Sequence, residues 1–240
     1  NYDQRRPISE ALSQLSKIPL FLKIMELCPI PDLEIENLLI RLRRILLLER
    51  ENIIATDDIL NFQVSLALQC FTNEFIYGET EEETSAVESL EAILQKASYN
   101  GNETSSYDIA CLASYRPLHC YPWAKKLKCS ENIKPIMERH IFEVQREIDL
   151  RGSILQLNPI EEPVSLAVQD QYEENPYPRW ICSNYSKNKE ISVSKAINNE
   201  INPNSVTYEN NQKLKVLVAG CGTGIQILQT QRYSNAQVTS

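Results

Sequence analysis

Apolar residues recur at helical spacing from residue 8 to about residue 180, and a strand-like run appears only near residue 214. The first apolar helix is expected over Ile18–Leu27, where two prolines end it. The next follows Asp32, a good N-cap because its carboxylate can accept from free backbone N–H groups. Its leucines form a wide apolar face, which predicts a buried helix. Arg41, Arg43 and Arg44 lie among those leucines and are expected on its solvated side.

Five further helical segments follow, most of them bounded by capping residues, glycine or proline. We expect them over residues 57–77, 79–96, 109–115, 130–150 and 165–174. Asp57 or Asp58 is the expected cap of the first, and Gly78 its end. Asn100-Gly101 is a turn signal. These elements predict an all-helical domain of antiparallel helix pairs over residues 1–182. No consensus recurs with a 34-residue period, so a strict helical repeat is not predicted, although a degenerate helical-hairpin array stays possible.

The composition changes after Trp180. Residues 183–212 are rich in Asn, Ser and Lys, which predicts a linker with one weak helix near residues 193–200. Leu214–Ala219 is then a short apolar run of buried-strand type, Ile225–Gln229 begins an amphipathic helix, and the last residues again have the pattern of a strand. We therefore expect a mainly α chain whose residues 213–240 hold the first β-α-β elements of a Rossmann-like fold.

Three of the six glycines fall at positions 220, 222 and 224, between the predicted strand and helix. Glycine there permits positive φ and lets a ligand lie directly against the peptide plane. A dinucleotide fingerprint needs a third glycine where Ile225 stands, so that motif is excluded. The candidate cofactor-binding residues are Ala219, Gly220, Cys221, Gly222, Thr223 and Gly224. The alternative is a glycine-rich turn without a ligand.

A second candidate segment precedes the linker. It combines aromatic rings, charges and two prolines, and its prolines favour a stiff, extended backbone. Such a segment costs little entropy to order against a ligand. Its candidate residues for contact with substrate or cofactor are Tyr172, Glu173, Asn175, Tyr177, Arg179 and Trp180, with Glu174 as a further carboxylate near the site. The alternative is that its aromatic rings only pack the helical layer onto the next domain.

Together these two motifs resemble the class I S-adenosylmethionine-dependent methyltransferases that bacteria fuse behind tetratricopeptide repeats. The core Tyr115-Arg116-Pro117-Leu118-His119 is also similar to the helical region of that family. The resemblance implies a cytosolic enzyme with S-adenosylmethionine as its cofactor. It also implies that the catalytic fold continues beyond Ser240, so these 240 residues are expected to bind the cofactor weakly or not at all. The family usually has an acidic residue where this chain has Ala219.

Charge and cysteine content narrow the classes of partner and the cellular compartment expected for the chain. The formal net charge is −8, with 24 Lys and Arg against 32 Asp and Glu, so nucleic acid is not expected as a partner. No apolar run reaches the roughly 18 residues of a membrane span, and no signal peptide opens the chain. Seven scattered cysteines fit a reducing cytoplasm. Tight Cys-x2–4-Cys pairs are absent, so no metal site is predicted, and His140 is expected to be a partly buried, hydrogen-bonded residue within a helix.

Two functions of different class stay open. The first is the N-terminal portion of a methyltransferase: a helical region for a substrate, protein or peptide partner, followed by the cofactor loop. The second is a helical protein-interaction module without catalytic activity. The sequence does not identify the methyl acceptor.

Overall fold

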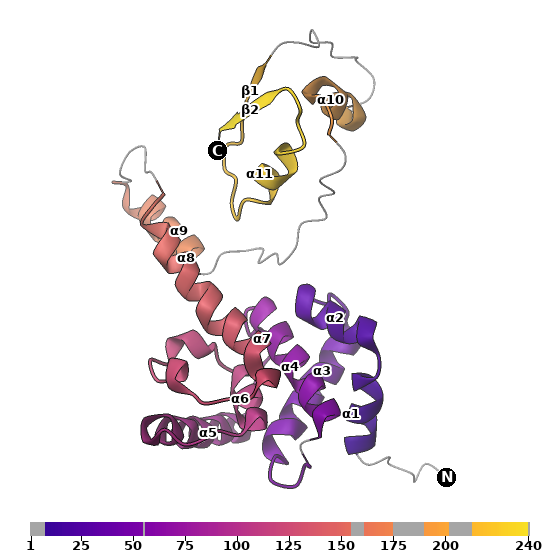
Figure 1. Cartoon of the computed structure of the whole chain (residues 1–240), viewed down its shortest axis with the longest axis vertical. Coiled ribbons are helices and arrows are strands. Elements are labelled where there is room, and N and C mark those ends of the chain that lie inside the picture. Colours follow the sequence, from indigo (N-terminus) through magenta and orange to yellow (C-terminus); the bar gives the residue numbers. More distant parts are fainter. Residues whose placement is uncertain (1–7, 55, 155–160, 175–189, 202–212, 240) are drawn as a thin grey trace. The chain divides into compact units, whose positions relative to one another are not determined.

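The computed structural model describes residues 8–54, 56–154, 161–174, 190–201 and 213–239 (Figure 1). The chain is mainly helical and has one two-stranded parallel sheet in its described part. It divides into two units, Asn1–Pro159 and Ile160–Ser240. The predicted boundary at residue 182 lies outside the described residues.

Unit 1 contains helices joined by short connections. Its α-helices are α1 (Ile8–Ser16), α2 (Pro19–Leu27), α3 (Leu33–Leu48), α4 (Asp57–Thr72), α5 (Glu81–Asn100), α6 (Ser106–Ala113), α7 (Lys134–Met137) and α8 (Glu143–Arg151). Short 3₁₀ turns lie at η1 (Leu118–Cys120), η2 (Ala124–Lys126) and η3 (Glu131–Ile133), and a π-helical turn, η4 (Glu138–Phe142), joins α7 to α8.

Capping residues fix where several of these helices begin and end. The carboxylate of Asp32 accepts from the amides of Glu34 and Ile35, as predicted for the start of α3. The cap of α4 is Thr56, whose hydroxyl accepts from the amide of Ile59, so the predicted Asp57 or Asp58 cap was wrong. A hydroxyl can occupy the Ncap position as well as a carboxylate, and here the aspartates lie in the first turn, near the positive end of the helix dipole.

Helix α5 has a capping signal at each end. Thr80 and Glu83 form a reciprocal capping box at its start, which satisfies two backbone N–H groups. Gly101 ends the helix with left-handed backbone angles, φ 67° and ψ 20°. The helix therefore continues to Asn100, one turn beyond the predicted end near residue 96.

Helix α4 forms the centre of unit 1 and is buried along almost its whole length. It contacts α1, α2, α6 and α7, and the buried apolar side chains of unit 1 form one core from Leu12 to Ile141. The sequence predicted that α4 would continue to Tyr77. It ends at Thr72 because Glu74 and Phe75 adopt positive φ values of 58° and 55°, which no α-helix accommodates.

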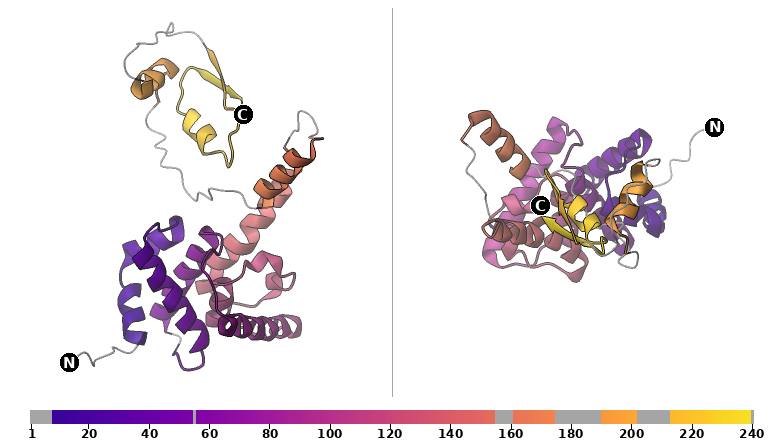
Figure 2. Two further views of the ribbon diagram at one scale, coloured as in Figure 1. Left: turned by 180° about the vertical axis from the view of Figure 1, so that it is seen from behind. Right: turned by 90° about the horizontal axis from the view of Figure 1, so that it is seen from above.

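The first half of the helix that runs through α7 and η4 is packed in the core, and its second half is not. Ile136, Met137, His140 and Ile141 are buried, whereas α8 has no buried residue. Figures 1 and 2 show α8 extending away from the packed helices of unit 1. Pro135 lies in the first turn of α7, where the missing N–H costs nothing.

Unit 2 contains α9 (Pro163–Glu174), α10 (Val193–Ile201), strand β1 (Leu214–Leu217), α11 (Ile225–Thr230) and strand β2 (Ala236–Thr239). The two strands are parallel and are connected through α11, so they form the predicted β-α-β element. Within the segment predicted as a linker, residues 193–201 form α10, whose Val193 and Ala196 side chains are buried. The remaining linker residues 183–189 and 202–212 lie outside the described residues.

Candidate functional site

The predicted cofactor loop follows the carboxyl end of β1. Leu214 pairs with Ala236 and Leu217 with Thr239 in the parallel register. The amide of Val218 donates to the carbonyl oxygen of Thr239 over 2.8 Å. The loop therefore begins at the sheet edge where both strands end, which is the edge at which open α/β sheets bind ligands.

All three glycines of this loop have positive φ. The values are 65° at Gly220, 52° at Gly222 and 88° at Gly224. No heavy atom lies within 4 Å of a Cβ built on any of them, beyond the immediate chain neighbours. The backbone conformation requires glycine at these positions, whereas packing against other described residues does not. A ligand thus has room to approach the peptide planes of the loop.

The structure brings the six predicted loop residues together in one turn. Ala219 is exposed, and Cys221 and Thr223 are half-buried. The amide of Gly224 donates to the carbonyl of Cys221 over 2.9 Å, which closes the turn before α11. The chain between β1 and α11 is therefore a compact glycine turn.

The second predicted segment is described only at its start. Tyr172 and Glu173 lie in the last turn of α9 and are exposed. The side-chain amide of Gln169 donates to Glu173 over 2.7 Å, one turn away along the helix. Asn175, Tyr177, Arg179 and Trp180 lie outside the described residues, so their approach to the glycine loop stays a prediction.

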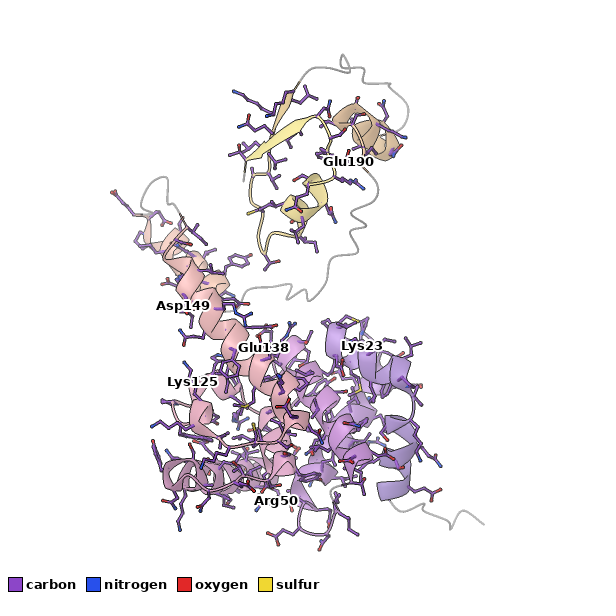
Figure 3. The ribbon with its side chains drawn as sticks, in the orientation of Figure 1. Lys23, Arg50, Lys125, Glu138, Asp149 and Glu190 are labelled. Atoms are coloured by element: carbon purple, nitrogen blue, oxygen red, sulfur yellow. The ribbon has the colours of Figure 1, made fainter. Side chains whose placement is uncertain are left out.

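The sequence did not predict the contacts that residues 191–193 make at the amino end of β2, opposite the glycine loop. Ile191 follows Glu190, which is labelled in Figure 3. It forms a parallel bridge with Tyr233. The Oδ1 atom of Asn235 accepts from the amide of Val193 over 3.1 Å, at the start of α10. Residues 191–193 therefore contact the β-α-β element at the start of β2. An Asn directly before a strand was the only sequence signal for this contact.

Unit 1 holds a buried cation that the sequence placed on the surface. Arg43 was expected on the solvated side of its helix, but only 2% of it is exposed. Its guanidinium donates to the carbonyl oxygens of Gly78 at 2.7 Å, Tyr77 at 3.3 Å and Ser114 at 3.5 Å. The prediction was wrong because these acceptors come from distant parts of the chain and satisfy the charge inside the core.

A carboxylate, Glu83, is linked to this cation through the aromatic ring of Tyr115. The Tyr115 ring centroid is 4.1 Å from the guanidinium carbon of Arg43, and the Tyr115 hydroxyl donates to Glu83 over 2.7 Å. Burial alone would raise the pKa of Glu83, but hydrogen bonds from Tyr115 and Thr80 outweigh it and lower that pKa. A two-fold hydrogen-bonded ion pair with Arg116, at 2.7 and 2.8 Å, lowers the pKa of the neighbouring Glu79. These contacts join α3, α5 and the end of α6, and we interpret them as structural.

His140 lies in the π-helical turn and is completely buried, so the expectation of partial burial was wrong. Its ring packs against Phe71 with 4.4 Å between centroids, and against the edge of Phe75 at 6.2 Å. The Nδ1 atom of His119 is 3.2 Å from the carbonyl oxygen of His140. No group of three or more His, Cys, Asp or Glu side chains in the described ranges is arranged to hold a metal ion.

The buried cysteines are poor nucleophiles. Burial raises the pKa of the Cys70 thiol to about 12 and raises that of Cys111 further, in spite of the nearby Arg43 and Gln63, respectively. A thiol must ionise to attack, so these two are inert at neutral pH. Cys28, Cys120 and Cys129 are exposed free thiols.

Comparison with known proteins assigns the chain to no family. No family model, no curated protein and no solved structure matches the chain. No helix in the described residues is long and apolar enough to cross a membrane.

Proposed function

We propose that residues 214–239 are the opening β-α-β unit of a Rossmann-like, class I methyltransferase fold, and that residues 219–224 are its S-adenosylmethionine loop. The observation that carries the proposal is the positive φ of Gly220, Gly222 and Gly224 at the carboxyl end of two parallel strands. A sequence that only needed a turn would not place three such glycines at the ligand-binding edge of a sheet.

The spacing of the loop favours S-adenosylmethionine over a dinucleotide. In a dinucleotide fold the third glycine allows the helix to pack closely on the strand, and this chain has the half-buried Ile225 there. The glycines at positions 220, 222 and 224 instead follow the pattern of the methyltransferase loop. Because no neighbouring atom occupies the space beside them, the loop fits a ligand held against the backbone.

S-adenosylmethionine supplies an activated methyl group, and the protein must align a nucleophile with it and exclude water. A general base is needed only when the acceptor has to lose a proton. Tyr172 and Glu173 are the described members of the segment that we propose for this part of the site, and both are exposed at the end of α9. We further propose that the helical unit 1 takes a protein or peptide substrate or partner.

The test is calorimetric titration of S-adenosylmethionine into the longest protein product that contains this chain. Gly222→Ala should abolish or strongly weaken binding, because the added Cβ occupies the open face of the loop and disfavours its φ of 52°. Gly152→Ala is the matched control, since Gly152 also has open space beside it but has a φ of −66°. Exchange of the Val218 amide, which donates to Thr239, reports whether the sheet of each variant stays folded.

Loss of binding with a protected Val218 amide supports a loop that contacts the ligand. Absence of binding in the unsubstituted long product, or equal binding by the Gly222→Ala variant, refutes the proposal. Tight binding of NAD by the same protein would refute it as well.

A helical interaction module without catalysis is the second candidate. It is favoured by one observation: the large buried core, from Leu12 to Ile141, lies entirely within unit 1. If unit 1 alone carries the function, removal of residues 214–240 leaves partner binding unchanged and no S-adenosylmethionine binding is found in any longer product.

A further inference from the structure

The end of helix α5 carries the one Asn-Gly dipeptide of the 240-residue sequence. Asn100 is the last residue of the helix and is exposed, and Gly101 follows with φ 67°. Glycine offers no side chain to block approach of its amide nitrogen to the preceding side chain. This dipeptide therefore joins a carboxamide and an unhindered backbone nitrogen at an accessible helix end.

We propose that Asn100 is a site of spontaneous deamidation whose rate is set by opening of the last turn of α5. The amide nitrogen of Gly101 loses its proton and attacks Cγ of Asn100. The new Cγ–N bond closes a succinimide ring while the Cγ–Nδ2 bond breaks and ammonia leaves. Water then adds to one of the two ring carbonyls and opens the ring, which gives aspartate or isoaspartate. The net reaction consumes one side-chain amide and one water, and it forms one carboxyl group and one ammonia.

A neighbouring cation favours this reaction. The Nζ atom of Lys128 lies 3.8 Å from the position of a Cβ built on Gly101. Lys128 forms no ion pair with another residue of the described chain, so its charge is available at this turn. A positive charge stabilises both the deprotonated amide and the oxyanion that forms on Cγ. Lys125, labelled in Figure 3, lies on the same lysine-rich stretch, 124–128.

The helix cap opposes the reaction in the folded chain. The amide of Gly101 donates to the carbonyl of Ser98 over 3.3 Å, and that of Asn102 donates to Ala97 over 3.1 Å. These bonds form a Schellman cap, and the first of them engages the nitrogen that must attack. Two backbone hydrogen bonds of ordinary net strength correspond to roughly thirtyfold protection, so the native rate follows the opening of this turn.

The products would alter the helix end. Aspartate at position 100 places a negative charge at the C-terminus of α5, where the dipole disfavours it. Isoaspartate adds a methylene to the main chain inside the capped turn and breaks the geometry of the Ala97 and Ser98 bonds. Either product therefore weakens the helix cap that protects Asn100 in the folded chain.

The experiment is peptide mapping by mass spectrometry after long incubation of the intact chain at neutral pH. Asn100 should convert faster than any other asparagine of the described segments. Conversion in urea should be roughly thirtyfold faster than in buffer, as the two cap bonds imply. Lys128→Gln should slow the native reaction by about two- to fivefold without changing the rate in urea, as expected for a single charge at a partly exposed site. Asn102→Gln, which alters a neighbouring exposed asparagine, is the matched control and should leave conversion at Asn100 unchanged.

Each outcome decides one part of the proposal. If another asparagine converts first in the native chain, Asn100 is not the preferred site. If the rates in buffer and in urea are equal, the α5 cap does not control the reaction. If Lys128→Gln changes nothing, the cation has no role.

Discussion

The guanidinium carbon of Arg43 lies 4.1 Å from the centroid of the Tyr115 ring, and the hydroxyl of that tyrosine donates to Glu83 over 2.7 Å. One aromatic ring thus links a buried cation to a buried carboxylate. The two terminal nitrogens of the guanidinium donate to the backbone carbonyls of Tyr77, Gly78 and Ser114. Arg43 therefore holds the loop between α4 and α5 and the end of α6 against α3.

Replacing Arg43 should destabilise the chain far more than replacing its neighbour. Arg43→Met leaves three carbonyls without their donor, and we expect a loss of about 3 kcal/mol in the free energy of unfolding, as for other broken buried charge contacts. Arg44→Met is the matched control, since Arg44 makes only an exposed ion pair with Glu82 at 2.8 Å, worth less than about 1 kcal/mol. Urea unfolding of the full chain, followed by circular dichroism, measures both. Equal losses would show that the buried contacts of Arg43 contribute nothing specific.

Acid should weaken the same region. Hydrogen bonds from Arg116 lower the pKa of Glu79, and hydrogen bonds that outweigh burial lower the pKa of Glu83. A carboxyl group whose pKa is lower in the folded state stabilises that state above its unfolded pKa, near 4.5, and the stabilisation is lost as pH falls through the folded pKa. We therefore expect stability to decline as pH falls below about 4.5.

Glu79→Gln should make that decline shallower, because the substituted side chain no longer takes up a proton. The measurement is the urea midpoint as a function of pH. Glu88→Gln, on the exposed face of α5, is the control and should leave the slope unchanged. Identical slopes for all three proteins would contradict the assignment to Glu79.

Sequence reasoning predicted what local chemistry determines. Asp32 caps α3, Asn100-Gly101 marks a turn, and the run at Leu214 is a strand, because each depends on residues adjacent in the chain. Arg43 was misplaced because its acceptors lie 34 to 71 residues away and are backbone atoms, which no side-chain pattern reveals.

The predicted end of α4 at Tyr77 was wrong for a related reason. Glu74 and Phe75 adopt left-handed angles although neither is glycine, so no residue type signalled the break. At the candidate site, the glycine spacing predicted a turn between a strand and a helix, and the structure has one. The contact of Asn235 with α10 depends on tertiary placement, and its sequence signal was too weak to interpret.

The stability of α10 in unit 2 should depend on the side chain of Asn235. Asn235→Ala removes the acceptor for the Val193 amide, and loss of such a helix cap costs about 1 kcal/mol. Amide exchange in α10 should then accelerate by roughly fivefold, which is what that energy implies. Gln237→Ala, at an exposed position of β2, is the control and should leave exchange in α10 as it is. Unchanged exchange in the Asn235→Ala variant would mean that Asn235 does not hold α10.

Position 219 offers a gain-of-function test of the cofactor loop. The methyltransferase family that we propose for this chain usually has an acidic residue there, and Ala219 is exposed directly before the first glycine. Ala219→Asp should tighten S-adenosylmethionine binding by about tenfold in the longest protein product, because the carboxylate gains a charge-assisted hydrogen bond to the cofactor. Ala219→Asn tests whether charge is required and should give a smaller gain. Weaker binding by the Asp variant would argue against residues 219–224 as the S-adenosylmethionine loop.

Thiol alkylation followed by mass spectrometry tests both units in one experiment. Cys28, Cys120 and Cys129 are exposed and should be alkylated in the native chain, whereas the buried Cys70 and Cys111 should react only after unfolding. Burial raises the pKa of Cys120 and of Cys129, so their rates should still be rising with pH above neutrality.

The alkylation rate of Cys221 reports on ligand binding at the glycine loop, because Cys221 is a half-buried free thiol between Gly220 and Gly222. In the longest protein product, S-adenosylmethionine should slow alkylation of Cys221 severalfold and leave the rate at Cys28 unchanged, because a ligand held against the loop covers only the first of these thiols. Equal slowing at both sites would indicate a general effect on the reagent or the fold, and no slowing at Cys221 would count against a cofactor at this loop.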